Sequence, residues 1–566
     1  MDALNPPAWV RKRDGRLEPF DADKISRALF AASESLGRPD AFLARELTDG
    51  VAHFLAEEAD NATATTNQIA ELTIKVVREL GQPALATAFA DHGASRDRAK
   101  SPATAATPDA PRAAGRPAGE EIVLRFAAGA APADVLSSCT NAYTLNAVFA
   151  RDLVAAHGDG LLILTGLGAP GELAGLVARP ADGNVLTAVE QARRFVGDFL
   201  ALDGPEYELA RAGKDIASEV RTFARELSAG LRLSGLRAVL NLNAAAPPPW
   251  ADDVAGGPLF AGQRLAPASD RLSLVADEVA RALLTPQSAA NPIRIDWHLS
   301  ERDFRREAAE RLTVMARQAL DGAPLAFVFD RPRRPAPLAE GVDREHPAVL
   351  LTVGVRLPRL AEQPGVDGDP TRFLKKLGSL ARLALSAGVQ KREFLRRQER
   401  GRPHDASAAP PVTNGFLLDR ARLVVAPVGL DEVVRRFTGG GLCSGKDSLD
   451  FGKQVVQTLR DVLRQDGGRS RLAACLDGPD RFRFGGGWPA AGQVAGLTAW
   501  DAAAVPKVQL RAAGALHALA EGGTAALLLA EGPRPSAETV ADYLRTAWKQ
   551  PDVNRIRLAR GGGKLQ

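Results

Sequence analysis

The N-terminal stretch VRKRDGRLEPFDADKISRAL, residues 10–29, contains the two local signals that decide how the chain begins to fold. Asp14-Gly15 lies between two short extended runs, which predicts a β-hairpin with a tight turn. Asp21 precedes apolar residues at helical spacing, so the sequence predicts a helix that is capped by Asp21 and stops at Gly37. Basic residues lie on both elements, and the question is whether they form a solvated surface or a phosphate site.

The rest of the first hundred residues continues as helix. The segments PDAFLARELTDGVAHFLAEEA, TTNQIAELTIKVVRELGQ and PALATAFADHGASRDRAK carry apolar residues at helical spacing. Residues 101–119, SPATAATPDAPRAAGRPAG, are rich in Pro and Ala and lack large apolar side chains, which is typical of an extended linker. We therefore expect a mainly helical module at residues 1–100 and a boundary at this linker.

From residue 120 to residue 566, helical and strand patterns alternate. Such alternation predicts a large α/β domain, and about eight to ten strands fit an extended sheet or a barrel. A Pro- and Arg-rich insertion at 330–347 separates two of the strands. The expected helices are 142–156, 186–200, 209–228, 270–284, 301–320, 370–396, 447–465 and 537–547. The expected strands are GLLILTG, LRAVLNL, PIRIDWH, LAFVFD, AVLLTVGV, ARLVVAPVG, AALLLAEG and RIRLAR.

Composition excludes several classes of protein. The 566 residues carry 72 Lys and Arg against 68 Asp and Glu, and a net charge of +4 does not suggest a protein that coats nucleic acid. Three scattered cysteines, Cys139, Cys443 and Cys475, cannot form a four-cysteine zinc site, so we expect no zinc and a reducing, cytoplasmic location. Gly, Pro and charged residues interrupt every apolar run before it can cross a membrane.

The basic residues of the opening stretch suit a phosphate ligand. A triphosphate needs several cations from different elements, because a single ammonium gains little against its own hydration. Lys12 and Arg13 lie on the hairpin, Lys24 lies one turn into the helix, and Arg96 lies near the last helix of the module. A helix N-terminus adds backbone N–H groups and a positive dipole. The alternative interpretation is a charged surface without a ligand.

The same stretch resembles the ATP-cone, a small nucleotide-binding control domain at the N-terminus of many ribonucleotide reductases. The resemblance covers residues 9–100 and implies ATP or dATP, with Mg²⁺, as the ligand. The family often has a His near the nucleotide where this chain has Ala70, which predicts weaker binding or a restriction to one nucleotide. The expected nucleotide-binding residues are Val10, Lys12, Arg13, Gly15, Glu18, Asp21, Lys24, Ile25, Thr65, Thr66 and Arg96.

Four later segments resemble, in the same order, parts of the barrel of anaerobic, class III glycyl-radical ribonucleoside-triphosphate reductases. They are FARDLVAAHGDGLLILTGLG, VLLTVGVRLPRLAE, LVVAPVGLDEVVRRFTGGGL and EGGTAALLLAEGPRPSAETV, at residues 149–168, 349–362, 423–442 and 521–540. The resemblance implies a ten-stranded α/β barrel over residues 120–566 and a homodimer. Periodicity alone indicates only a large α/β domain.

The chain departs from that family where radical chemistry needs particular residues. The family places a thiol in the loop before an N-L-P-R strand, but residues 330–347 contain no cysteine. The family stores its radical on a Gly in a C-terminal R-x-x-G-Y-like loop, whereas no Tyr follows Gly561, Gly562 and Gly563 in this chain. The paired C-x-x-C zinc motifs of the family tail are also missing. We therefore expect no glycyl radical and assign no catalytic residue.

Polar positions of two matched segments have changed as well. Where the family has Asp, His, His and Asp, this chain has Leu161, Ile163, Thr165 and Gly166. Arg356 replaces the Asn of N-L-P-R. Arg356 still offers a cation to a phosphate, but it lacks the acceptor of a carboxamide.

The segment TGGGLCSGKDS, residues 438–448, allows three interpretations. Gly440 and Lys446 have the spacing of a Walker A loop, but Asp447 replaces the Ser or Thr and a helical pattern precedes the loop. A plain loop that leads into the next helix is the second interpretation. The third is a phosphate-facing loop inherited from the reductase barrel, for which the expected residues are Arg356, Gly440, Gly441 and Ser444.

Three functions remain open from the sequence. The first is a sensor or regulator that binds ATP or dATP and whose barrel has lost radical chemistry. The second is a working reductase with relocated catalytic residues that makes deoxynucleotides. The third is another enzyme on the retained barrel. His298 beside Asp296 allows two interpretations of its own, an acid–base dyad or a structural histidine at a strand end. We expect nucleotides and a second copy of the chain as partners, and neither nucleic acid nor membrane.

Overall fold

A computed structural model divides the chain into two compact units, Met1–Leu162 and Ile163–Gln566. The expected linker at 101–119 lies outside the described residues, and the two helices that follow it group with the N-terminal unit. The sequence instead placed the start of the large domain at residue 120. The described residues are 7–12, 15–58, 63–98, 132–178, 185–211, 215–243, 269–284, 292–331, 337–400, 416–477, 504–520, 525–529, 535–550 and 552–560.

The N-terminal unit begins with a three-stranded sheet in the order β2-β1-β3. β1 pairs antiparallel with β2 and parallel with β3, which confirms the predicted hairpin. Gly15 lies in the turn with a φ of +82°, a left-handed conformation that costs glycine little. The strands are β1 (Trp9–Arg11), β2 (Leu17–Pro19) and β3 (Ala64–Thr65).

Six helices are described in the same unit. Asp21 caps α1 as predicted, because its carboxylate accepts the Asp23 N–H at 3.0 Å, and Gly37 follows the helix with a φ of +70°. Leu29 and Val51 are fully buried, so apolar faces of α1 and α2 form the core of this unit. The helices are α1 (Ala22–Ser35), α2 (Ala41–Glu58), α3 (Thr66–Glu79), α4 (Pro83–Arg98), α5 (Pro132–Ala147) and α6 (Arg151–Gly158).

The large unit is built on a sheet with a path of ten strands, in the order β12-β11-β10-β5-β6-β7-β8-β9-β14-β13, and β4 pairs with β10 beside this path. Neighbours from β5 to β9 are parallel, as are those from β10 to β12 and β13 with β14, and antiparallel pairing joins β10 to β5 and β14 to β9. The predicted ten-stranded α/β architecture is confirmed. The strands are β4 (Leu162–Leu164), β5 (Leu173–Ala178), β6 (Val196–Asp203), β7 (Arg237–Asn243), β8 (Ile293–Leu299), β9 (Leu325–Phe329), β10 (Ala348–Arg356), β11 (Ala421–Val428), β12 (Ala474–Leu476), β13 (Ala525–Leu529) and β14 (Arg555–Arg560).

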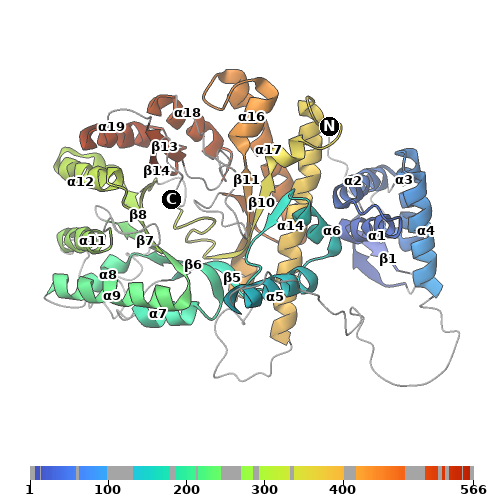
Figure 1. The fold of residues 1–566 in the computed structure, drawn as a ribbon, viewed down its shortest axis with the longest axis horizontal. Helices are drawn as coiled ribbons and strands as arrows, with labels where there is room; N and C mark the ends of the chain where they lie inside the picture. Colours follow the sequence, from blue (N-terminus) through green and yellow to red (C-terminus); the bar gives the residue numbers. More distant parts are fainter. Residues whose placement is uncertain are drawn as a thin grey trace. The chain divides into compact units, whose positions relative to one another are not determined.

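Helices lie outside this curved sheet (Figure 1). β9 and β11 are buried along their whole length, as strands covered on both faces must be. The helices are α7 (Val185–Ala192), α8 (Pro205–Arg211), α9 (Ile216–Ser234), α11 (Ser269–Leu283), α12 (Ala309–Leu320), α13 (Leu357–Ala361), α14 (Pro370–Arg400), α15 (Phe416–Arg420), α16 (Leu430–Thr438), α17 (Lys446–Ser470), α18 (Pro506–His517) and α19 (Ala537–Trp548). Among the described helices, none is both long and apolar enough to cross a membrane.

A short turn between β9 and β10 fills the interior of the sheet. Leu338, Ala339 and Val342 are fully buried, and the last two form an isolated antiparallel bridge. They share one apolar cluster with Phe199 of β6 and Val424 of β11. Because strands of both orientations contact this turn, the sheet wraps around it. The Pro- and Arg-rich insertion therefore ends inside the large unit.

One secondary-structure prediction is wrong in its second half. Residues 186–200 are predicted as a single helix, but α7 ends at Ala192 and β6 begins at Val196. The end of β6 is an apolar run that is buried on both sides, and such a run cannot be distinguished from buried helix by its periodicity. β5 and β12 are two further strands that the sequence pattern did not indicate.

Candidate nucleotide-binding site and barrel interior

Two lysines of the N-terminal unit converge on a single carboxylate oxygen. Lys12 Nζ lies 3.2 Å from Glu18 Oε2, and Lys24 Nζ lies 3.0 Å from the same atom. The three side chains come from the end of β1, from β2 and from the first turn of α1, and between 31% and 55% of each is exposed. An accessible phosphate at this point would meet two ammonium groups at once.

Glu18 holds both lysines in this structure. Hydrogen bonds from Lys24 and Lys12 lower the pKa of Glu18, so its carboxylate remains ionised and balances one of the two positive charges. Each ammonium has three N–H donors and gives one of them to Glu18, so a phosphate oxygen at this site competes with Glu18 for the charge of the two lysines while further donors stay available.

The predicted apolar residues of the site belong to the core of the unit. Val10 is 8% exposed and Ile25 is 7% exposed, so little of either side chain is accessible to a base. Asp21 is the N-cap of α1 and also lies 3.7 Å from Arg27. Its carboxylate stabilises the helix terminus, which leaves less of it for a ligand.

The two predicted threonines have partners within the protein. Thr65 caps α3 in a reciprocal capping box: its hydroxyl accepts the Gln68 N–H at 3.2 Å, and its own N–H donates to Gln68 Oε1 at 2.8 Å. The Thr66 hydroxyl donates to the Arg11 carbonyl at 3.4 Å, which ties α3 to β1. Both residues lie where β3 meets α3, one strand away from Glu18.

The structure describes only some of the remaining predicted residues. Gly15 forms the hairpin turn, and Ala70 lies in α3. Arg13 lies outside the described residues. Arg96 lies in α4, and only its backbone is described.

A buried ionic network occupies the tip of the interior turn in the large unit. The Glu340 carboxylate is 4% exposed and pairs with Arg294 of β8 and, at 4.0 Å, with Arg555 of β14. These arginines also contact Asp296, at 2.7 Å and 3.1 Å. Although burial by itself raises the pKa of Glu340, Arg294, Arg555 and Arg237 lower it well below its ordinary value. Glu340 is therefore a buried, ionised carboxylate.

The backbone of the tip is fixed on its other side. Gly341 N–H donates to Asp477 Oδ2 at 2.8 Å, and the Gly341 carbonyl accepts from Arg422, which also pairs with Asp343 at 2.9 Å. Gly341 has a φ of +74°, and a Cβ added there would lie 2.1 Å from a methyl group of Val424. Only glycine fits this position, and the turn is held in one conformation.

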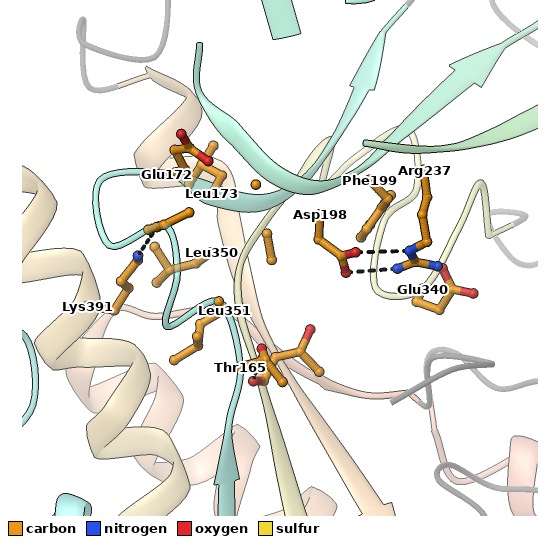
Figure 2. A pocket seen from close by; sticks show the side chains of 15 residues that line it. Thr165, Glu172, Leu173, Asp198, Phe199, Arg237, Glu340, Leu350, Leu351 and Lys391 are labelled. Carbon is orange, nitrogen blue, oxygen red and sulfur yellow. Dashed lines mark hydrogen bonds and ion pairs between the residues drawn. The ribbon is translucent and has the colours of Figure 1, made fainter. Parts of the chain in front are cut away.

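Glu340 borders a pocket of about 220 Å³, shown in Figure 2. Leu173, Leu350 and Leu351 give it apolar walls, and ionic side chains lie at its two ends. Pockets that hold drug-sized ligands measure roughly 300–1,000 Å³. The pocket therefore has room for a small molecule and is below the usual size for a whole nucleotide.

The ionic groups of this pocket already have partners. Arg237 and Asp198 form a forked pair with distances of 2.9 Å and 2.8 Å. Lys391 Nζ donates to the Pro170 carbonyl at 2.6 Å, and burial lowers the pKa of Lys391 to about 8, although Glu172 raises it. These contacts favour a structural role for the charged side chains at both ends of the pocket.

His298 does not pair with Asp296, so the structure fits the strand-end interpretation of this histidine and not the acid–base dyad. His298 Nδ1 lies 2.8 Å from Asp330, and Nε2 lies 2.9 Å from Asn241. Burial by itself lowers the pKa of His298, but Asp330 raises it above the ordinary value, so the imidazolium is favoured. His298 is a satisfied strand-end histidine, and Asp296 serves the network around Glu340.

The loop that resembles a phosphate-binding segment joins α16 to α17. A Walker A loop follows a strand, whereas a helix precedes this one. Gly441 N–H donates to Ser444 Oγ at 2.9 Å, and Leu442 N–H donates to Asp431 Oδ1 at 2.7 Å. The N–H groups of Gly441 and Leu442 are therefore occupied, with a carboxylate beside them, whereas no side chain caps the start of α17.

The structure brings together part of the predicted nucleotide-binding set, but not the predicted phosphate-binding set of the large unit. Lys12, Glu18 and Lys24 meet, whereas no hydrogen bond or ion pair of the described residues joins Arg356 to Gly440, Gly441 or Ser444. No sequence pattern marks Glu340 or its arginines, because each is a single charge within an otherwise ordinary segment. In the described part of the chain, no group of three His, Cys, Asp or Glu side chains is arranged to hold a metal ion.

Comparison with known proteins agrees with both halves of this description. The family model of the ATP cone domain matches residues 9–98. No curated protein sequence matches the chain. The structure is similar to the anaerobic ribonucleotide reductase from Thermotoga maritima in complex with dATP and CTP, with a TM-score of 0.56 and 12% identity over 75% of this chain and 82% of that chain.

Two further solved structures are similar in the same way. The Thermotoga maritima enzyme with citrate in the active site has a TM-score of 0.57 and 12% identity, and covers 75% of this chain and 90% of its own. A second anaerobic ribonucleotide reductase has a TM-score of 0.56 and 11% identity, with 76% and 78% covered. At such identities the similarity shows the fold. The chain therefore combines an ATP-cone domain with the fold of anaerobic ribonucleotide reductases.

Proposed function

We propose that this protein binds ATP or dATP, with Mg²⁺, at its ATP-cone domain and uses the bound nucleotide to regulate the large unit. The observation that carries the proposal is the convergence of Lys12 and Lys24 on Glu18 Oε2. A phosphate group offers the same kind of oxygen with more negative charge, so it can replace Glu18 as the counter-ion of both lysines. The solvated-surface alternative predicts no such exchange.

We also propose that the large unit has lost radical reductase chemistry. The resemblance places a thiol in the interval 330–347, and the buried tip of that interval here is Glu340. A thiyl radical requires a sulfur atom, whereas a carboxylate held by Arg294 and Arg555 is a fixed counter-ion. Gly561, Gly562 and Gly563 lie outside the described residues.

A working reductase is the second candidate, because Cys475 packs beside the interior turn. This cysteine is 3% exposed and shares the apolar cluster of Leu338, Ala339 and Val342. A thiol in that place is what relocated radical chemistry would need. Anaerobic incubation with a radical-generating activase and a ribonucleoside triphosphate tests this candidate: a deoxynucleotide product that disappears in Cys475→Ala would establish it and overturn the loss of chemistry.

Calorimetric titration of the intact chain with ATP and dATP, each with Mg²⁺, tests nucleotide binding. We expect saturable binding, and Lys12→Met and Lys24→Met are each expected to weaken it by roughly tenfold, since each removes a charge-assisted hydrogen bond to phosphate. Lys75→Met is the matched control, because Lys75 is also exposed but lies more than two turns into α3. No saturable binding, or equal losses in all three variants, would contradict the proposal.

From the family resemblance we further propose a cytoplasmic homodimer. Light scattering of the intact chain with and without nucleotide measures the mass directly. A monomer under both conditions would contradict the dimer and leave nucleotide binding untouched.

A further inference from the structure

A buried charged junction links three helices of the N-terminal unit. Arg45 of α2 is 5% exposed, and its guanidinium lies 2.5 Å from Asp23 of α1 and 3.5 Å from Asp49. Asp152 of α6 is 2% exposed and accepts a hydrogen bond from the Ser26 hydroxyl of α1 at 3.5 Å. The junction therefore joins the ATP-cone helices α1 and α2 to α6, which lies beyond the segment matched as the cone.

The charges of this junction act on one another. Although burial by itself lowers the pKa of Arg45, Asp49, Asp23 and Asp152 raise it, so this guanidinium faces three carboxylates. Burial raises the pKa of Asp152, and the charge of Asp23 raises it further, while Arg27 and Arg45 act in the opposite direction. With all groups ionised, three carboxylates face two guanidinium groups.

The junction begins at the candidate nucleotide site. Asp23 precedes Lys24 in the first turn of α1, and its N–H donates to the N-cap Asp21. A phosphate bound at Lys24 would lie within one helical turn of Asp23, well inside the distance over which charges interact at physiological salt. Nucleotide binding would therefore change the electrostatic potential at Asp23.

The junction ends where the chain enters the large unit. α6 ends at Gly158, and β4 begins four residues later and pairs with β10. Just beyond β4, the Thr165 hydroxyl donates to the Thr352 carbonyl of β10 at 2.7 Å. The segment after α6 is thus fixed in the large sheet, and a change in α6 has a short covalent route to it.

We propose that α6 reports nucleotide binding to the large unit, and that Asp23, Arg45 and Asp152 are the positioning residues that couple it to the nucleotide site. This inference rests on the proposed function. Coupling between two sites is reciprocal, so a junction that transmits nucleotide binding to α6 also lets α6 influence nucleotide affinity. Arg45 and Asp152 are buried, so solvent screens the interaction between their charges only weakly.

Hydrogen–deuterium exchange of the intact chain, with and without saturating Mg-ATP, tests the proposal. We expect ATP to slow exchange in α6 and in residues 159–165 by about threefold or more, as expected for a local opening that the ligand disfavours. In Arg45→Met we expect this response to disappear while slowing in α1 and α3 persists. Asp152→Asn keeps the side-chain shape and is expected to lose the response in the same way, which covers the case of an Arg45 variant that does not fold.

Two further variants separate coupling from a merely structural role. Arg151→Ala removes an exposed ion pair between α6 and Glu34 of α1, at 3.3 Å, and is expected to keep the response. Arg45→Lys retains the positive charge and is expected to keep part of the exchange response in α6. Binding of ATP without a response in α6, a response that survives in Arg45→Met and Asp152→Asn, or a Lys variant that behaves like Met would overturn the coupling. Absence of ATP binding by the unaltered protein would instead overturn the proposed function itself.

Discussion

The two charged sites of this protein, one in each unit, are built in opposite ways. Lys12, Lys24 and Glu18 are between 31% and 55% exposed, whereas Glu340 and Arg555 are at most 4% exposed. Water screens the first group, so a ligand can replace one partner at small cost. The second group has lost its hydration, and removal of one partner leaves an uncompensated charge. Exchangeable charge thus favours a ligand site, and fixed charge favours a permanent structural role.

The largest expected effect comes from Glu340→Ala. We expect it to lower the free energy of unfolding of the large unit by about 3–5 kcal/mol, because Arg294 and Arg555 would remain buried without their carboxylate. Urea denaturation followed by tryptophan fluorescence, to which Trp297 of the large unit contributes as a side chain that is 1% exposed, measures this loss.

Asp198→Ala is the control for that change. Asp198 also pairs with an arginine at the same pocket, but 53% of its side chain is exposed, so we expect a cost below about 1 kcal/mol. Equal costs for the two variants would remove the distinction between fixed and exchangeable charge.

Glu206 is expected to give the second largest effect, through pH. Burial raises the pKa of Glu206 from its ordinary 4.5 to about 7, although hydrogen bonds from Asn243 lower it. Between these values the folded protein keeps a proton that the unfolded chain has released. The free energy of unfolding therefore falls as pH rises from about 4.5 to about 7, by about 3 kcal/mol from this group.

Glu206→Gln cannot ionise and should flatten that part of the pH profile. Urea denaturation of both proteins at several pH values between 4.5 and 8 provides the comparison. Parallel profiles for the two proteins would show that Glu206 does not titrate in this range. A steeper profile in the Gln variant would reverse the assigned sign.

The local structure around Lys12, Glu18 and Lys24 could be predicted from sequence because its signals are local. One short stretch, residues 10–25, contains all of these signals. They are the Asp-Gly pair of the hairpin, the Asp21 cap, and Lys12 and Lys24 on either side of them. The hairpin brings β2 beside β1, and the cap fixes the first turn of α1, so both lysines reach Glu18 without any distant contact. The hydroxyls of Thr65 and Thr66, which depend on how α3 is capped, were less predictable.

The barrel interior could not be predicted in the same way. Arg294, Glu340 and Arg555 lie on β8, an interior turn and β14, and only the folded sheet brings them together. The sequence does indicate that residues 330–347 lack a cysteine, but their Pro and Arg content does not indicate a buried tip. The same limit explains the error at Val196, where burial on both sides hides the strand period.

The smallest expected effect comes from Glu18→Gln, which directly tests whether the exposed charges of the N-terminal unit can be exchanged. Glu18→Gln removes the carboxylate that competes with phosphate for Lys12 and Lys24, so we expect ATP affinity to rise by roughly threefold, the scale of one exposed ion pair. The thermal midpoint should stay almost unchanged, in contrast with Glu340→Ala. Glu79→Gln, an equally isosteric change at an exposed residue at the end of α3, controls for net charge. If Glu18→Gln instead weakens ATP binding, then Glu18 contacts the nucleotide itself, as a ribose or base partner would, and the exchange of counter-ions is wrong.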